Sequence, residues 1–457
     1  MQRKRLVLNT ALLTLSSLLM SGIGMGFQAW LVKRIGPTGI GLYQLTLSVT
    51  NLGATFAISG IRFAATRLVA EELGAENPGG IRTAMRRCLA YGSFFGLAAL
   101  LILYFLADPI GGYAIHDART IRSLKIAAFS MPCVSLCSAL SGYFTACGRV
   151  WKPTLVHLIE QLASIGFVAA FLGRVPSGEI ERSCAAVTLG RLGGDLLSLL
   201  LMLLAYSLDR RGRGKETGET LSLTGRMLRI AVPLAVSAYA RSALSTIQHL
   251  LVPRGLRSAG FSADRALAGY GVVQGMVMPI LFFPSCLLGA LAELIVPELT
   301  EAQVRGDGKE IRRASRELIR DSFLYSAAVA LFLFLCADPL AWAIYKSSQA
   351  GRYIRILAPL VPILYTDMTV DGCLKGLGQQ VWSMGFNILD ALLGLLLVVW
   401  LLPRYALGGY LVLVYVTESF NFVLSALRLR RVLPRCAPAG DHHPCEGSEK
   451  CAYRAAG

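Results

Sequence analysis

The sequence predicts an all-α polytopic membrane protein, and three observations support this fold class. Of its 457 residues, 54% are hydrophobic. The apolar residues fall into about twelve blocks of roughly 20 residues, the length that crosses a hydrocarbon layer of ~30 Å. One half of the chain also repeats landmarks of the other half. We therefore expect about twelve transmembrane helices in two parallel six-helix bundles related by an internal repeat.

The repeat links residues 81–160 to residues 311–390 at a constant offset. Its anchors are mostly residues that fix helix ends and kinks for backbone reasons, so they stay recognisable when the residues between them change. The matched pairs are Ile81-Arg82 with Ile311-Arg312, Ala107-Asp108-Pro109 with Ala337-Asp338-Pro339, Pro132 with Pro362, Gly142 with Gly372, Gly148 with Gly378, and Glu160 with Asp390. An even number of spans in each half gives both halves the same orientation.

Six spans are expected in the first half, at residues 7–32, 40–61, 88–106, 124–147, 153–172 and 184–206. A Gly-Pro-Thr-Gly turn at residues 36–39 separates the first two. A cytoplasmic helical extension follows the second, and Asn77-Pro78-Gly79-Gly80 ends it. Pro132 is expected to bend the fourth span, because it removes a backbone hydrogen bond.

The second half is expected to repeat this plan, with spans at residues 227–251, 268–291, 323–336, 354–374, 382–402 and 409–427. The segment 209–225 is polar and reads as a cytoplasmic linker. The predicted domains are therefore residues 1–208 and 226–430, joined by 209–225. The polar tail, 431–457, is expected to be cytoplasmic and disordered.

The net charge of +17 does not indicate nucleic-acid binding here. With the N-terminus placed in the cytoplasm, most of the 45 lysines and arginines fall at cytoplasmic helix ends and loops. This asymmetry is the positive-inside rule, and it places both termini on the cytoplasmic side of the plasma membrane. We expect the basic clusters to face anionic lipid headgroups, and we expect a monomer.

The eleven cysteines do not form a disulfide framework. Eight lie in or beside apolar segments, where a thiol behaves as a small hydrophobe. The tail contains the other three, Cys436, Cys445 and Cys451, with His442 and His443. Their spacing is not that of a zinc finger or ribbon, so we expect neither a metal site nor a cofactor.

Four short stretches that follow predicted spans carry a family resemblance. They are Arg67-Leu68-Val69-Ala70-Glu71-Glu72, Leu251-Val252-Pro253-Arg254-Gly255-Leu256, Val296-Pro297-Glu298-Leu299-Thr300-Glu301-Ala302 and Leu374-Lys375-Gly376-Leu377-Gly378-Gln379. Their order and spacing resemble the multidrug/oligosaccharidyl-lipid/polysaccharide exporter superfamily. The likeness is to its stage V sporulation protein B and polysaccharide flippase branch, which is related to the lipid II flippase MurJ.

The resemblance implies a flippase for undecaprenyl-diphosphate-linked sugars, such as an oligosaccharide or a peptidoglycan precursor, in wall, polysaccharide or spore cortex synthesis. Two features depart from similar sequences. The position before His249 is often acidic in them and is Gln248 here. The first span, residues 7–32, lacks the arginines of MurJ.

A diphosphate headgroup requires a cationic cavity, and arginine suits it because its guanidinium binds phosphate through two hydrogen bonds. Arg241 lies near the middle of the seventh span, where a charge costs ~2.5–3.5 kcal/mol, so it should face a cavity or a buried carboxylate. Arg62 either contacts substrate or extends to the headgroups. Gln248 and His249 are further substrate-site candidates, although a lone histidine is more often an interface residue.

Two carboxylates, Glu160 and Asp390, occupy equivalent positions of the repeat. They could relay protons or bind a coupling cation, or each could pair with a basic residue of its own bundle. Arg191 and Asp195 are four residues apart on one predicted helix, so we interpret them as an intrahelical ion pair outside the site. Asp371 and Lys375 should pair in the same way.

Three functions compete at this stage. Translocation of a lipid-linked sugar diphosphate fits the resemblance and the mid-membrane arginine. A cation-coupled multidrug exporter would favour a carboxylate in the first span, and residues 1–70 contain none. A membrane enzyme is disfavoured, because no Gly-rich phosphate loop follows a predicted strand and the outside loops are short.

Overall fold

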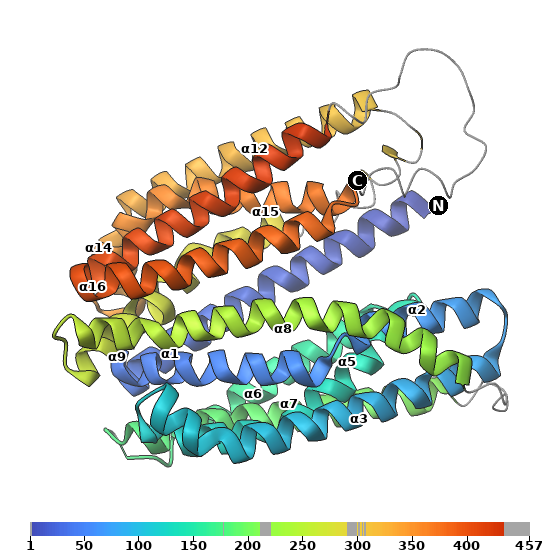
Figure 1. The fold of residues 1–457 in the computed structure, drawn as a ribbon, viewed down its shortest axis with the longest axis horizontal. Helices are drawn as coiled ribbons and strands as arrows, with labels where there is room; N and C mark the ends of the chain where they lie inside the picture. Colours follow the sequence, from blue (N-terminus) through green and yellow to red (C-terminus); the bar gives the residue numbers. More distant parts are fainter. Residues whose placement is uncertain are drawn as a thin grey trace.

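The computed structural model describes residues 2–176, 178–210, 221–289 and 308–433, together with residues 299, 302, 303 and 305. The cysteine and histidine residues of the tail, and most of the predicted linker, lie outside this part. All regular elements within it are helices (Figure 1). The eight cysteines it contains are free thiols, as predicted.

The helices of the first half are α1 (Gln2–Ile58), α2 (Ile61–Gly74), α3 (Pro78–Pro109), α4 (Ile121–Ala128), α5 (Met131–Ala146), α6 (Trp151–Leu172) and α7 (Ile180–Arg210), with short turns η1 (Ile110–Ala114) and η2 (Ala118–Thr120). Those of the second half are α8 (Leu221–Ser258), α9 (Ala263–Gly271), η3 (Val272–Val277), α10 (Met278–Phe282), η4 (Phe283–Ser285), α12 (Gly308–Leu335), α13 (Ala337–Tyr345), α14 (Ser348–Leu357), η5 (Ala358–Leu360), α15 (Val361–Gly376) and α16 (Gln380–Val432).

The number of membrane crossings agrees with the prediction. Nine helical segments of the described residues are long and apolar enough to span a bilayer, and the bent pair α4–α5 makes a tenth. Two of these ten, α1 and α16, are broken in the middle, where Gly36 has φ 71° and Ala406 has φ 50°. Each folds back on itself at this break (Figure 1). The described chain therefore contains twelve crossings.

The expected bend at Pro132 has a different origin from the one predicted. The span is divided between α4 and α5, which meet at 43°. Pro132 lies in the first turn of α5, where a missing N–H costs nothing because the first four N–H groups of a helix have no partner. Pro362 begins α15 in the same way. These prolines start the second helix of a broken span rather than bend a continuous one.

The internal repeat extends to side-chain contacts. Lys125 Nζ lies 2.9 Å from a carboxylate oxygen of Asp108, and Arg355 pairs with Asp338 at the equivalent place in the second half. Both pairs join residues 17 apart in the chain. The two halves thus kept an ion pair whose basic member changed from lysine to arginine.

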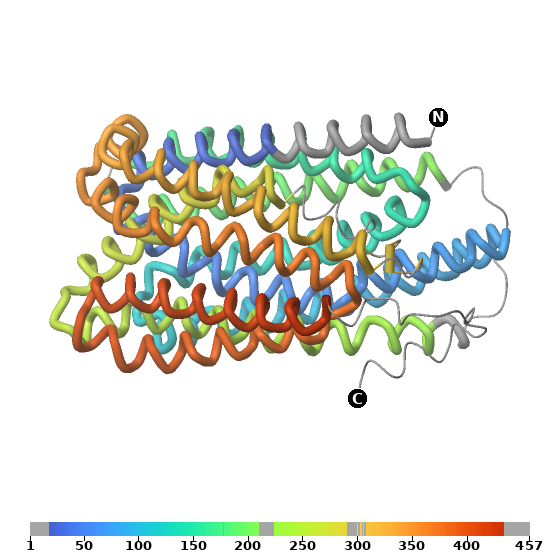
Figure 2. Tube along the Cα trace, turned by 90° about the horizontal axis from the view of Figure 1, so that it is seen from above, coloured from blue at the N-terminus to red at the C-terminus, as the bar shows by residue number. Residues whose placement is uncertain are grey.

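The two ends of the molecule differ. α8 begins and α16 ends toward the same end, which we call the terminal end (Figure 2). We call the opposite end, where α1 and α16 fold back, the distal end. The α12–α16 group and the α1–α8 group approach each other at the distal end and diverge toward the terminal end (Figure 1).

Contacts between the two halves close the distal end. Arg119 holds Asp117 of its own half at 2.7 Å and Asp264 of the other half at 2.9 Å. We call these three residues the distal latch. The hydrogen bond to Asp117 raises the pKa of Arg119, so its charge is secure. Nearby, Gly41 lies so close to α9 that a Cβ there would come 2.1 Å from the carbonyl oxygen of Leu267.

We predict that Asp264→Asn loosens the distal end without unfolding the protein. Asp264 is 66% exposed, and exposed pairs contribute roughly 0.2–1 kcal/mol, while Arg119 keeps Asp117 as its partner. Hydrogen–deuterium exchange of the α8–α9 connection should therefore accelerate roughly two- to fivefold. Asp338→Asn is the matched control, because its ion pair lies within one half. Equal acceleration in both variants, or in neither, would contradict the latch.

Candidate functional site

The predicted site residues lie in three separate places. Arg241 and His249 line a pocket between the two halves, which we call the central pocket. Arg62 and Glu160 line a cavity inside the first half, which we call the first-half cavity. Asp390 lines neither of them and lies inside the second half.

The central pocket has a volume of about 430 Å³ and lies between α1, α8 and the α9–η3 segment. Its lining is rich in hydroxyl and amide groups and includes no carboxylate. The lining residues are Gln44, Leu47, Ser48, Asn51, Thr55, Ala238, Arg241, Ser242, Ser245, Thr246, His249, Tyr270 and Gln274. Such groups donate hydrogen bonds to phosphate and sugar oxygens.

Arg241 is the only arginine or lysine among the residues that line this pocket. It lies in the middle of α8, is exposed, and forms no ion pair within the described part of the chain. A guanidinium at this depth needs water or a ligand if it has no carboxylate partner. Of the two placements predicted for Arg241, the structure shows the cavity and not the buried pair.

His249 and Gln248 face different neighbours. The Nδ1 atom of His249 lies 3.2 Å from the hydroxyl of Tyr270, so the histidine borders the pocket as a hydrogen-bonded interface residue. Gln248 packs instead against α16, where a Cβ added at Gly394 would be 2.8 Å from its amide. Gln248 therefore does not lie in the central pocket with Arg241 and His249. Successive helix residues point about 100° apart, which turns Gln248 away from the pocket that His249 borders.

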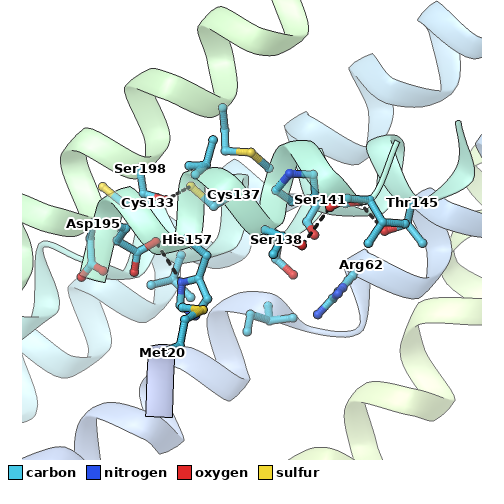
Figure 3. Close-up of a pocket in the computed structure, with 18 residues that line it drawn as sticks. Met20, Arg62, Cys133, Cys137, Ser138, Ser141, Thr145, His157, Asp195 and Ser198 are labelled. Carbon is cyan, nitrogen blue, oxygen red and sulfur yellow. Dashed lines mark hydrogen bonds and ion pairs between the residues drawn. The ribbon is translucent and has the colours of Figure 1, made fainter. Parts of the chain in front are cut away.

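The first-half cavity has a volume of about 600 Å³ and lies between α1, α2, α5, α6 and α7 (Figure 3). Arg62 lies at one end of it, and Asp195 with His157 lies at the other (Figure 3). Glu160 Oε2 is 3.5 Å from His157 Nδ1. Arg62 thus shares a cavity with acidic groups and not with Arg241, so the predicted pair of substrate arginines is split.

The interpretation of Arg191 and Asp195 as an ion pair was wrong. Arg191 Nη1 donates a hydrogen bond to the hydroxyl of Tyr43 at 3.2 Å, and no direct pair joins it to Asp195 in the described structure. Asp195 instead lines the first-half cavity with Glu160. The sequence did not identify Asp195 as a cavity residue, because its spacing from Arg191 suggested an ion pair. Arg191 instead contacts Tyr43, which lies in a distant part of the chain.

Asp390 belongs to a group of acids within the second half. Its Oδ1 atom and that of Asp367 are buried without a hydrogen-bond partner among the described residues. Asp367 Oδ2 accepts a hydrogen bond from Asn421 at 3.1 Å. Asp371 pairs with Lys375 at 2.5 Å, as predicted. Glu160 thus has a basic neighbour in its own bundle, whereas Asp390 has none in the described ranges.

No group of three or more His, Cys, Asp or Glu residues in the described ranges is placed to hold a metal ion. A central pocket offers one cation and many hydrogen-bond donors, and an internal cavity offers two carboxylates and a histidine.

Comparisons with known proteins fit this architecture. The family model MatE matches residues 13–171 and 258–400. The chain is 22% identical to stage V sporulation protein B of Bacillus subtilis, over 95% of this chain and 85% of that protein. It is 24% identical to the probable multidrug resistance protein NorM of Acinetobacter baylyi, over 79% of this chain and 83% of that protein.

Solved structures share the fold. An inward-facing multidrug resistance MATE family transporter of the MOP superfamily superposes with a TM-score of 0.71 at 14% identity, covering 93% of this chain and 96% of that one. An outward-facing structure of such a transporter reaches 0.62 at 15% identity, with the same coverage.

Proposed function

The chain belongs to the MatE family of membrane transporters, and we propose that it is a flippase for undecaprenyl-diphosphate-linked sugars. In this proposal it acts as a monomer in the plasma membrane, with the terminal end in the cytoplasm. Its cargo is an oligosaccharide or a peptidoglycan precursor for polysaccharide, wall or spore cortex synthesis. The similarity to stage V sporulation protein B supports this choice over other cargoes of the family.

The observation that carries the proposal is Arg241 in the central pocket. A diphosphate brings at least two negative charges into the membrane, and it needs a cation that no protein carboxylate already neutralises. Arg241 meets this requirement, and the hydroxyl and amide groups around it supply donors for the remaining oxygens. A pocket for a cationic drug would instead be expected to contain an acid.

The position of the pocket suggests how transport proceeds. With the distal end closed, the diphosphate would reach Arg241 from the terminal end while its polyprenyl chain stays in lipid. Separation of the two halves at the distal latch and closure at the terminal end would then present the same pocket to the other side. Glu160 and Asp195 of the first-half cavity are our candidates for a coupling proton or cation.

We predict that Arg241→Ala lowers flipping about a hundredfold or more, because two charge-assisted hydrogen bonds of ~1.5–3 kcal/mol each are lost. The assay reconstitutes the protein in liposomes with a labelled undecaprenyl-diphosphate sugar and times the loss of label protection. Arg229→Ala is the matched control, since Arg229 is an exposed arginine of α8 that does not line the central pocket. Normal flipping by inserted Arg241→Ala protein would refute the assignment.

A cation-coupled multidrug exporter is the second candidate, and the first-half cavity favours it. Its volume of about 600 Å³ and its two carboxylates suit an organic cation, and the NorM relative is named for multidrug resistance. Arg62 counts against it, because its positive charge lies in the same cavity.

The two functions predict different effects of Glu160→Gln. If the cavity carries drugs, this variant should lose gradient-driven movement of a dye cation about tenfold or more, because the cation loses its counter-charge. If the cavity only couples ions to flipping, wild-type protein should move no dye, and Glu160→Gln should slow lipid flipping under a gradient while leaving Arg241-dependent lipid binding intact. Both are measured in the same liposomes.

A further inference from the structure

The distal end of the first half carries cations that its position does not explain. If the terminal end is cytoplasmic, the distal end is the side that the positive-inside rule depletes of lysine and arginine. Arg119, Arg122, Lys125 and Arg182 nevertheless gather there, around the start of α4 and α7. Arg119 serves the distal latch, and Lys125 pairs with Asp108. Arg122 is left to explain, and Arg182 has only an exposed pair with Glu179.

Three neighbouring hollows share Arg122. One, of about 480 Å³, is polar and includes Arg119, Arg182, Glu179 and Glu181. A second, of about 560 Å³, runs along α4 to Lys125 and Phe129. The third, of about 430 Å³, lies between α4, α6 and α7. Arg122 itself is exposed and forms no ion pair or hydrogen bond with any described residue.

The third hollow has two chemically different parts. Arg122 and Arg182 lie near the beginnings of α4 and α7, at the boundary of the spans. The rest of the lining is apolar, and within it Ile126 and Leu189 lie about one and two helical turns further along α4 and α7 than the arginines. It consists of Ile126, Phe171, Val175, Ala185, Ala186 and Leu189. A cationic rim above an apolar wall matches an amphiphile with an anionic head.

We propose that this groove binds an anionic glycerophospholipid, with its phosphate on Arg122 and its acyl chains along Ile126, Phe171 and Leu189. Arginine at the level of the headgroups binds a phosphodiester through two hydrogen bonds and keeps its own charge. Arg182 is the second phosphate ligand. It now lies 2.9 Å from Glu179 in a pair whose members are 60% and 42% exposed, so little energy opposes its transfer to phosphate.

The repeat supplies a natural contrast. Arg352 occupies the position in α14 that Arg122 has in α4, and it is also exposed. Arg352 lines none of the five hollows described above, so the apolar groove beside Arg122 has no counterpart among them. The lipid site is therefore assigned to the first half only.

Native mass spectrometry of the full-length protein, released from detergent with defined lipids, tests the proposal. Phosphatidylglycerol adducts should survive on the wild type and fall about tenfold or more in Arg122→Ala, while Arg352→Ala should retain them. Glu179→Gln should strengthen retention several-fold, because it frees Arg182. A purely structural role of Arg122 would not produce this gain. Thermal unfolding with phosphatidylglycerol should show the same ranking.

Several outcomes would overturn the proposal. Equal adduct retention by the wild type and Arg122→Ala would exclude the arginine. Equal retention of phosphatidylcholine and phosphatidylglycerol would exclude recognition of net charge. Retention of undecaprenyl phosphate in preference to phosphatidylglycerol would mean that the groove holds an isoprenoid lipid and not a glycerophospholipid.

Discussion

The structure depends on one constraint, which is that hydrocarbon offers no partner to a charge. Several charged side chains within the spans satisfy it with a protein partner. Lys375 pairs with Asp371, His157 lies against Glu160, and Arg191 donates to Tyr43. Arg241 differs, because it lines an open pocket among polar side chains that carry no negative charge. A cation without an acidic partner that also lines an open pocket is therefore the feature that separates Arg241 from Arg191 and from the structural pairs.

The duplication explains why the scaffold and the sites evolved differently. Both halves keep a span broken ahead of a proline and an acid–base pair at the distal end, since these features set helix ends and directions. The interiors have diverged. The acids of the first half line a cavity that Arg62 also lines, whereas Asp390 and Asp367 of the second half line none of the five hollows described above. One fold thus holds two halves with different electrostatic roles.

The spans and the repeat could be predicted from the sequence because they depend on local properties. These are the length of each apolar block and the Gly, Pro and Asp residues at helix ends. Short motifs predicted both the break at Gly36 and the start of α3 after Asn77. The side-chain partners could not be predicted as well. Arg191 and Asp195 have the spacing of a helical pair, yet Tyr43, 148 residues away, takes the arginine. Gln248 and His249 are adjacent in sequence but face different neighbours, α16 and Tyr270. Such choices depend on which helices meet, which local spacing does not encode.

The central pocket and the distal latch are linked through α8 and α9. The pocket ends at His249 and Tyr270, and α9 carries both Tyr270 and Asp264. The close packing of Gly41 against α9 allows little independent movement between that helix and α1. A headgroup that displaces Tyr270 would therefore act on the same rigid element that carries the latch acid. Because the latch pair is exposed and weak, and Arg119 keeps Asp117 when Asp264 leaves, the latch itself adds little to the cost of opening the distal end. The larger part of that cost is the packing of α1 against α9 around Gly41.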